Sequence, residues 1–344
     1  MAAERPESAP CADAMVKASF AVSVVIEWYN VTHAELDRAT RMLAALTSQA
    51  VSLHSGDANA PTVLSGPLEL VIAFDSDKLD AAQVRRVIDD VIRPSESLTL
   101  RYLPVSDANY CKLKNAGAAI ATGEIIIFLD SDLNPEPEWL AAFLSAFANP
   151  NVSVAVGNTY VDFSGDDVYS KSLALTWMFP MRDPDGGLSL SKSFYANNAA
   201  FRRETFLSRQ FPDVPGLTHV PAKLLVERLE REGVAIWSIG HARASHPVPN
   251  GVVHFVERAV SAGRARAFAE RSVTVALIVR WVHYDIRCVY VGFKNIVFKG
   301  FKVGLRWREI PAAMAITGMY FAFLLSGSLL SVIAPRTMRD RFQL

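Results

Sequence analysis

The chain has 344 residues, of which 51% are hydrophobic and 20% are charged. Disordered chains are poor in apolar residues and rich in charge, so this composition excludes wholesale disorder and indicates one large or two ordinary folded domains. The formal net charge is zero, but the charges are unevenly distributed. From Arg271 to Leu344 there are eleven basic and three acidic residues, about +8 in total, so the first 270 residues carry about −8.

The first part of the chain alternates between patterns typical of strands and of helices. Residues 1–19 are a polar leader that we expect to be flexible, and they lack the apolar segment of a signal peptide. Ala21 to Ile26 is apolar and β-branched, as in strands buried on both faces. A helical pattern follows, and Leu68 to Phe74 reads as a second buried strand. This alternation predicts a mostly parallel sheet flanked by helices, with right-handed crossovers.

The same alternation continues along the chain. Residues Asn158 to Ser193 have no clear pattern, and we assign no element there. The expected elements on either side of that segment are a helix at about Asn109 to Thr122, a strand at Glu124 to Leu129, a helix beginning at Pro135, a strand at Val152 to Gly157, a helix at Ala222 to Glu232 and a strand at Val234 to Ile239.

Acidic residues follow three of the predicted strands. Glu27 follows the first strand, Asp75 the second, and Asp130-Ser131-Asp132 the most apolar one. Ligands of open α/β sheets bind beyond the carboxyl ends of the strands. Two carboxylates separated by one residue can hold a divalent cation that neutralises a diphosphate. The alternative is a turn in which the aspartates cap the following helix.

Five segments occur in the order, and at about the spacing, found in family 2 glycosyltransferases with the GT-A fold, of the membrane-anchored bacterial type. They are VSVVIEWYN, LELVIAFDSD, KNAGAAIATGEIIIFLDSDLNPEPEWL, NNAAFRRETF and RLEREG. The resemblance covers Ala21 to Gly263 and implies a Rossmann-like GT-A domain over residues 20–263. It also implies transfer of a sugar from a nucleoside-diphosphate sugar, with inversion at the anomeric carbon.

The resemblance assigns roles to the strand-end residues. Glu27, Asn30 and Asp75 match positions that hold the base and ribose of the nucleotide. Asp130 matches the first carboxylate of the DxD motif, near the ribose and the metal. Asp132 matches the second carboxylate, which usually ligates Mg²⁺ or Mn²⁺.

Four further residues have both a functional and a structural interpretation. Lys114 matches the basic residue of the family's RNAG signature and can reach the nucleotide or its phosphates, or it lies on a solvated helix face. His246 matches a further metal ligand or diphosphate contact, or it is a histidine before a proline turn. Asn197 and Asn198 match the donor-sugar and acceptor pocket, or they build a turn.

The general base expected from the family is missing at its usual position. The Glu-Asp pair that should provide it aligns with Pro221 and Ala222, and neither side chain can accept a proton. His219 or Asp213 can substitute, or the acceptor is an anion such as polyprenyl phosphate and needs no base. The alternative function is that of a catalytically inactive, nucleotide-sugar-binding membrane partner of another transferase.

Residues 264–344 are expected to form basic, apolar helices that associate with a membrane. The uncharged run at residues 310–334 would reach about 37 Å as a helix, more than the roughly 30 Å of a bilayer core. It predicts a transmembrane span, with a buried core helix as the alternative. Because sugar nucleotides are cytoplasmic, we expect the catalytic domain on the cytoplasmic face of the cell membrane.

The segment before that run is apolar but carries charges. Val273 to Phe293 contains Arg280, Asp285 and Arg287, which disfavour a simple span. We expect a helix at the membrane interface or packed under the catalytic domain, with a second span as the rival. A further helix is expected to start near Asn295, with one apolar and one basic stripe. No nucleic-acid partner is expected, because the basic residues accompany an apolar tail.

Overall fold

The structure is a computed structural model that describes residues 18–29, 36–55, 62–163, 167–179, 182, 186–214, 220–270 and 273–341. Most of the expected leader, residues 1–17, lies outside the described residues. Its last two residues belong to strand β1 (Ala18–Phe20), which pairs with β3 (Thr62–Leu64) in a small separate sheet.

Within the described residues, the main sheet has nine strands, eight of them in the order β5-β4-β2-β6-β10-β8-β11-β7, with β9 pairing with β11. The strands are β2 (Val22–Glu27), β4 (Leu68–Asp75), β5 (Leu98–Val105), β6 (Ile125–Asp130), β7 (Asn134–Pro135), β8 (Val154–Val161), β9 (Leu188–Ser191), β10 (Asn198–Arg202) and β11 (Ile236–His246). Strands β5, β4, β2 and β6 are mutually parallel, whereas β10 runs antiparallel to β6 and β8.

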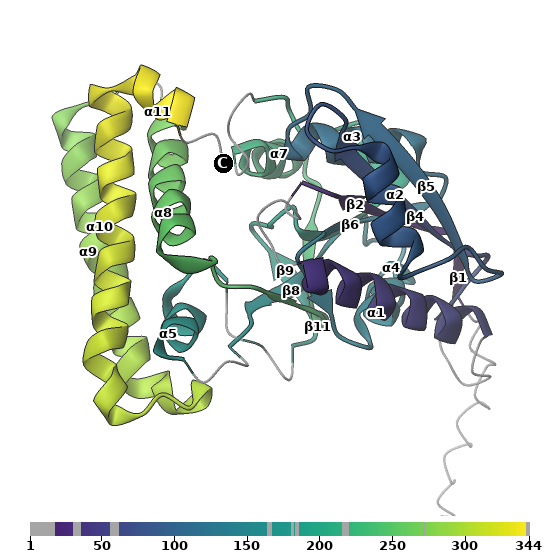
Figure 1. Cartoon of the computed structure of the whole chain (residues 1–344), viewed down its shortest axis with the longest axis horizontal. Coiled ribbons are helices and arrows are strands. Elements are labelled where there is room, and N and C mark those ends of the chain that lie inside the picture. Colours follow the sequence, from purple (N-terminus) through teal and green to yellow (C-terminus); the bar gives the residue numbers. More distant parts are fainter. Residues whose placement is uncertain are drawn as a thin grey trace, which may run out of the picture.

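Helices cover both faces of this sheet (Figure 1), and two hydrophobic clusters join them to it. The helices on one face are α1 (Leu36–Ser55), α2 (Ala81–Asp89) and α4 (Trp139–Phe147), and those on the other are α3 (Tyr110–Ile120), α6 (Arg203–Leu207) and α7 (Val220–Arg231). Every residue of β2, β4 and β6 is buried, because these strands have helices on both sides. The predicted α/β class is therefore confirmed.

Several elements differ from the sequence-based prediction. Strands β5 and β10 were not expected, and α4 begins at Trp139 and not at Pro135, which belongs to β7. The segment left unassigned continues β8 to Val161 and then contains helix α5 (Val168–Thr176) and strand β9. The last strand, β11, does not end at Ile239 but continues to His246, through a register shift between Ile239 and Arg243. Beyond that shift β11 still pairs with β8, and it also pairs with β7, so the extension has partners on both sides.

The C-terminal region is a group of long helices beside the sheet. Figure 1 shows α9 and α10 at the outer edge of the molecule, with α8 and α5 between them and the sheet. These helices are α8 (Gly251–Phe268), α9 (Val275–Lys299), α10 (Ile310–Ile333) and the short α11 (Pro335–Arg341). Helix α8 is continuous across residues 263 and 264, where we expected the catalytic domain to end.

Helices α8 and α10 are in backbone contact. A Cβ atom at Gly263 would lie 2.0 Å from the carbonyl oxygen of Leu324, and one at Gly327 would lie 2.2 Å from that of Val260. The two glycines therefore allow a closer approach than any other residue would permit.

The helix expected to start near Asn295 is not formed. Helix α9 already includes Asn295 and ends at Lys299, and a short 3₁₀ helix (Gly300–Val303) follows. Gly304 then adopts a left-handed conformation, with φ of 68°, and turns the chain toward the 3₁₀ helix Trp307–Glu309. Of the helices in the described part of the chain, only the one at Trp307–Ile333 is long and apolar enough to cross a bilayer.

Candidate active site

Three strand ends bring carboxylates to one edge of the sheet. Glu27 and Asp130 are the last residues of β2 and β6 and lie opposite each other in the parallel register. Asp75 ends the neighbouring strand β4. All three side chains are buried, as expected where parallel strands end beneath a layer of loops.

Lys114 is a buried cation at this edge. It is fully buried on α3, and its Nζ lies 2.7 Å from Oδ1 of Asp130. The hydroxyl of Tyr110, one turn earlier on the same helix, donates to the Asp130 carboxylate at 2.9 Å. The alternative that Lys114 lies on a solvated helix face is therefore wrong, because its ammonium group is buried and pairs with Asp130.

The carboxylates at this edge influence one another electrostatically. Burial, together with the adjacent charge of Asp130, raises the pKa of Glu27 well above its usual range. Burial also raises the pKa of Asp130, while the Lys114 ammonium opposes that rise. Lys114 thus supplies the positive charge that keeps an ionised Asp130 tolerable in the interior.

Asp132 and His246 form a second group beside the first. Among the described residues, Oδ1 of Asp132 is buried and has no hydrogen-bond partner. Its other oxygen, Oδ2, lies 3.7 Å from Nε2 of His246. Burial raises the pKa of Asp132, and the charges of Arg258 and Arg38 oppose that rise.

The state of His246 follows from its contacts. Its Nδ1 lies 2.5 Å from the carbonyl oxygen of Pro247, an acceptor, so Nδ1 carries the proton and Nε2 has a free lone pair. Burial, and then the positive charge of Arg258, lower the pKa of His246 to about 3. The imidazole is therefore neutral near pH 7, the form that ligates metals.

These two side chains suit a hard divalent cation. One buried oxygen of Asp132 has no partner in the described part of the chain, and the other lies 3.7 Å from the imidazole nitrogen that carries the lone pair. Mg²⁺ and Mn²⁺ accept such ligands. No group of three or more His, Cys, Asp or Glu side chains within the described ranges can hold a metal ion. A cation here would need further oxygen ligands from water or from a bound diphosphate.

Arg38 is a site residue that the sequence did not reveal. It lies on the buried face of α1, and its Nε donates to the main-chain oxygen of Asp132 at 2.5 Å. Its Nη2 donates to the carbonyl and hydroxyl oxygens of Ser245 at 2.7 and 2.9 Å, and its Nη1 pairs with Asp162 at 3.0 Å. The only available signal was an arginine at helical spacing with apolar residues, which is not specific for any function.

The residues assigned to the nucleotide base are only partly described. Asp75 accepts a hydrogen bond from the backbone N–H of Asp77 at 3.0 Å and lies 3.2 Å from Nζ of Lys78. Asn30 lies outside the described residues.

The two adjacent asparagines have different environments. The backbone oxygen of Asn197 accepts from the N–H of Asp130 at 3.1 Å, so Asn197 lies directly beside the acidic edge. The Asn198 side chain accepts from the indole N–H of Trp139 at 2.9 Å and donates to Ala242 at 3.2 Å, and it is buried. Both ends of the Asn198 amide already bind the protein interior, and a sugar contact by this residue stays a prediction.

Of the two candidate bases, Asp213 lies within the described residues. His219 lies outside the described residues. Asp213 is exposed and accepts a hydrogen bond at 3.2 Å from Asn109, the residue that caps α3 just before Tyr110. Pro221 and Ala222 are buried in the first turn of α7.

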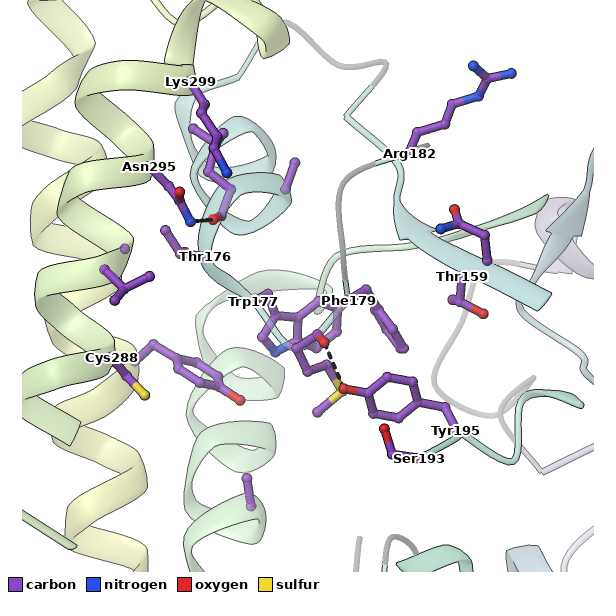
Figure 2. Close-up of a pocket in the computed structure, with 18 of the residues that line it drawn as sticks. Thr159, Thr176, Trp177, Phe179, Arg182, Ser193, Tyr195, Cys288, Asn295 and Lys299 are labelled. Carbon is purple, nitrogen blue, oxygen red and sulfur yellow. Dashed lines mark hydrogen bonds between the residues drawn. The ribbon is translucent and has the colours of Figure 1, made fainter. Parts of the chain in front are cut away.

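A cavity of about 1670 Å³ lies between the sheet and the C-terminal helices. Figure 2 shows that one wall comes from α9, with Cys288, Asn295 and Lys299, while Thr159 and Arg182 lie on the opposite side. Asn197 also lines the cavity, which therefore reaches the residue beside Asp130.

Aromatic rings separate this cavity from His246. The ring centres of Trp177 and Phe179 lie 5.4 and 4.7 Å from that of His246, and both residues line the cavity. Tyr195 packs against Phe179 and donates to the carbonyl of Met178 at 2.7 Å (Figure 2). The cavity and the Asp132–His246 group thus share one aromatic wall.

The sheet and its acidic edge define a mixed α/β protein of GT-A-like fold, with its candidate site at the strand ends. Residues 23–209, more than half of the chain, match the profile of glycosyl transferase family 2. The chain belongs to that family of glycosyl-transfer enzymes.

Two characterised relatives are similar over part of their length. The glucosyl-dolichyl phosphate glucuronosyltransferase of Haloferax volcanii is 27% identical across 41% of this chain and 44% of that protein. The chondroitin synthase of Escherichia coli is 24% identical across 64% of this chain and 34% of that protein. The chain therefore spans less than half the length of either relative.

The fold is also similar to a solved structure of the mannosyltransferase PcManGT from Pyrobaculum calidifontis in complex with GDP-Man and Mn²⁺. The alignment covers 94% of this chain and 84% of the mannosyltransferase chain. The two are 17% identical, with a TM-score of 0.48.

Proposed function

We propose that this protein is a metal-dependent, inverting glycosyltransferase that moves a sugar from a nucleoside diphosphate to a lipid-linked or other membrane-proximal acceptor. The observation that carries this proposal is the pair of Asp132 and a neutral His246 at the acidic edge of the sheet: Oδ1 of Asp132 has no partner among the described residues, and Oδ2 lies 3.7 Å from Nε2 of His246. An interior oxygen without a partner is unfavourable unless a ligand completes the site.

In this proposal, Asp132 and His246 hold Mg²⁺ or Mn²⁺, with Asp130 nearby. When bound, the cation would neutralise the charge of the departing nucleoside diphosphate. Asp75, Glu27 and Asn30 bind the base and the ribose. Lys114 acts through Asp130, because its ammonium group is buried and already paired.

The cavity between the sheet and the helices is the proposed acceptor site. Asn197 places its inner end beside Asp130, and Lys299 and Lys302 line it on the helical side. These two lysines suit an anionic acceptor such as a polyprenyl phosphate. Such an acceptor needs no general base, which agrees with Pro221 and Ala222 at the usual position of the base. For a glycan acceptor, Asp213 or His219 would act as the general base.

A second candidate function rests on the replacement of the family's acidic pair by Pro221 and Ala222. A chain with Pro221 and Ala222 in place of the acidic pair can bind a nucleotide sugar without transferring it, as a partner of another transferase at the membrane. Either function places the protein at the cell membrane, with its sheet on the cytoplasmic side.

The two candidates differ in the product formed by the purified chain. We expect transfer when the protein is incubated with Mn²⁺, a panel of UDP-, GDP- and dTDP-sugars, and either a polyprenyl phosphate or a glycan acceptor. Donor binding without transfer to either acceptor would favour the non-catalytic partner.

Asp132→Asn tests the metal assignment directly. We expect kcat/KM to fall about 100-fold or more, because even indirect partners of metal ligands contribute 10- to 100-fold. Mn²⁺ binding, measured by electron paramagnetic resonance, should weaken in parallel. Asp90→Asn, on an exposed carboxylate at the end of α2, is the matched control. Unchanged Mn²⁺ binding in Asp132→Asn would refute the assignment.

A further inference from the structure

Helix α9 exposes an apolar stripe along its outer side. Val275, Val279, Ile286, Tyr290 and Val297 are between 48% and 79% exposed. Their spacing of four and seven residues returns to the same side of a helix with 3.6 residues per turn. Buried residues such as Leu277 and Trp281 lie on the opposite side.

A row of basic residues runs directly beside this stripe. Arg280, His283, Arg287 and Lys294 are exposed and follow the same helical spacing, turned slightly around the helix. Next to this row, on the side away from the apolar stripe, α9 lines the cavity with residues such as Cys288. The basic row therefore lies between the apolar stripe and the cavity.

Helix α10 extends the apolar surface. It contains no charged residue, and its exposed residues include Met319, Leu330 and Ile333. Figure 1 shows α9 and α10 together at the edge of the molecule farthest from the sheet. Their outer sides are thus available as one apolar surface edged by cations.

The packing of α10 argues against its crossing a bilayer alone. Its backbone touches that of α8 at Gly263 and Gly327, and its Ser328 accepts a hydrogen bond at 3.0 Å from Arg266 of α8. Arg266 also pairs with Asp285 of α9 at 2.6 Å, so one half-buried network joins the three helices. A spanning α10 would take α9 with it and place Arg287, exposed at the middle of α9, in hydrocarbon.

We propose that α9 lies in the plane of an anionic membrane surface, with its apolar stripe at the acyl boundary and Arg280, Arg287 and Lys294 among the lipid headgroups. A helix with an apolar side flanked by cations has this preference. Helix α10 lies beside α9 in the same plane and does not span. This attachment replaces the transmembrane helix expected from the sequence: the apolar residues of α10 lie along the membrane surface and do not cross the bilayer.

The orientation has a consequence for the acceptor, which rests on the function proposed above. The basic row at headgroup level borders the cavity, so a lipid-linked acceptor in the same leaflet can enter the cavity sideways. Its phosphate, the group that attacks the sugar, would pass from the headgroup level along the basic row to the inner end of the cavity at Asn197, while its hydrocarbon chain stayed among the lipids.

Flotation of the full chain with vesicles tests the attachment. We expect binding to vesicles of phosphatidylcholine with 30% phosphatidylglycerol, and much weaker binding to phosphatidylcholine alone. Val279→Asp should reduce binding at least 10-fold, whereas Val51→Asp, on a helical valine of α1 that is 50% exposed, should not. Binding that is independent of anionic lipid, or unchanged in Val279→Asp, would overturn the proposal.

A second variant guards against loss of folding. Arg280→Gln/Lys294→Gln changes only exposed side chains and should weaken binding to the anionic vesicles about fivefold for each cation removed. Extraction of cell membranes at pH 11 should release the native chain, and retention in the membrane would instead show that α10 spans.

Donor binding in Mn²⁺ by thermal shift separates this proposal from the proposed function. If Val279→Asp loses vesicle binding but keeps the thermal shift caused by the donor, the result supports in-plane attachment. A native chain that binds vesicles but neither binds donor nor transfers sugar would overturn the proposed function alone.

Discussion

At the scale of single residues, Arg38 links the two proposed metal ligands. Its guanidinium group binds the main chain of Asp132 and of Ser245, the neighbour of His246. It therefore connects the turn after β6 to the end of β11, two segments that are far apart in sequence. Substitution of Arg38 would move both ligands without removing either.

The Lys114–Asp130 pair should be essential for stability. Lys114→Met removes one partner of a buried ion pair and leaves a carboxylate without its counter-charge, so we expect the free energy of unfolding to fall by about 3 kcal/mol. Urea denaturation measures this change. Lys114→Met/Asp130→Asn should recover part of the loss, and strictly additive effects of the two substitutions would contradict the pairing.

Glu136 should make stability depend on pH in acid. Burial favours its neutral form, but hydrogen bonds from Arg182, Arg243 and Tyr160 outweigh burial and hold the pKa of Glu136 at about 2, below the ordinary 4.5. The charged form therefore stabilises the fold above pH 4.5, and this contribution is lost as the pH falls from about 4.5 to about 2.

We expect Glu136→Gln to lower the free energy of unfolding at pH 7 by about 2 to 3 kcal/mol. The difference from the native chain should shrink toward pH 2, as measured by urea denaturation across pH. Glu138→Gln, which changes an exposed carboxylate two residues away, is the control. A difference that stays constant with pH would exclude the proposed contribution.

At the scale of elements, Gly117 sets how closely α3 approaches β2. A Cβ atom there would lie 2.4 Å from Cγ1 of Val25, so Gly117→Ala should push α3 outward and destabilise the fold by about 1 to 3 kcal/mol. Val25→Ala should relieve part of this effect in the double variant. Gly318→Ala, at a helical glycine with open space around it, should cause no loss. Thermal unfolding of the four variants measures these effects.

In the C-terminal region, the sequence predicted a helix starting near Asn295 that the structure does not contain. The pattern of Phe298, Phe301 and Leu305 fits one helix, but α9 ends at Lys299, and Gly304 in a left-handed conformation ends the 3₁₀ helix that follows. A glycine permits such a turn without requiring it, so periodicity alone did not show where the helix stops.

At the scale of the whole molecule, the cavity lies between the sheet and the C-terminal helices. If Lys299 and Lys302 bind an anionic acceptor, Lys299→Gln/Lys302→Gln should raise KM for a polyprenyl phosphate about 10-fold or more, since hydrogen bonds to charged groups contribute about 1.5 to 3 kcal/mol each. Binding of the donor with Mn²⁺ should not change. Lys223→Gln, on an exposed lysine of α7, is the control. Equal KM values in all three proteins would place the acceptor elsewhere.

The sequence by itself determined the α/β class, the family resemblance and the strand-end carboxylates. Buried parallel strands require uninterrupted apolar runs, and residues at their carboxyl ends must lie at one edge. Glu27, Asp75, Asp130 and Asp132 could therefore be located by pattern alone. The opposite charges of the two halves were also readable, because charge depends only on composition.

Only the tertiary structure decided how those residues pair. Lys114 pairs with Asp130, Asn198 binds Trp139, and Arg38 binds the main chain of Asp132. Each contact joins residues that are distant along the chain, so no local sequence pattern predicts it. The same holds for α10, since an apolar helix can span a bilayer or pack beside other helices. Its backbone contact with α8 at Gly263 favours the second arrangement, because that close fit depends on both helices at once.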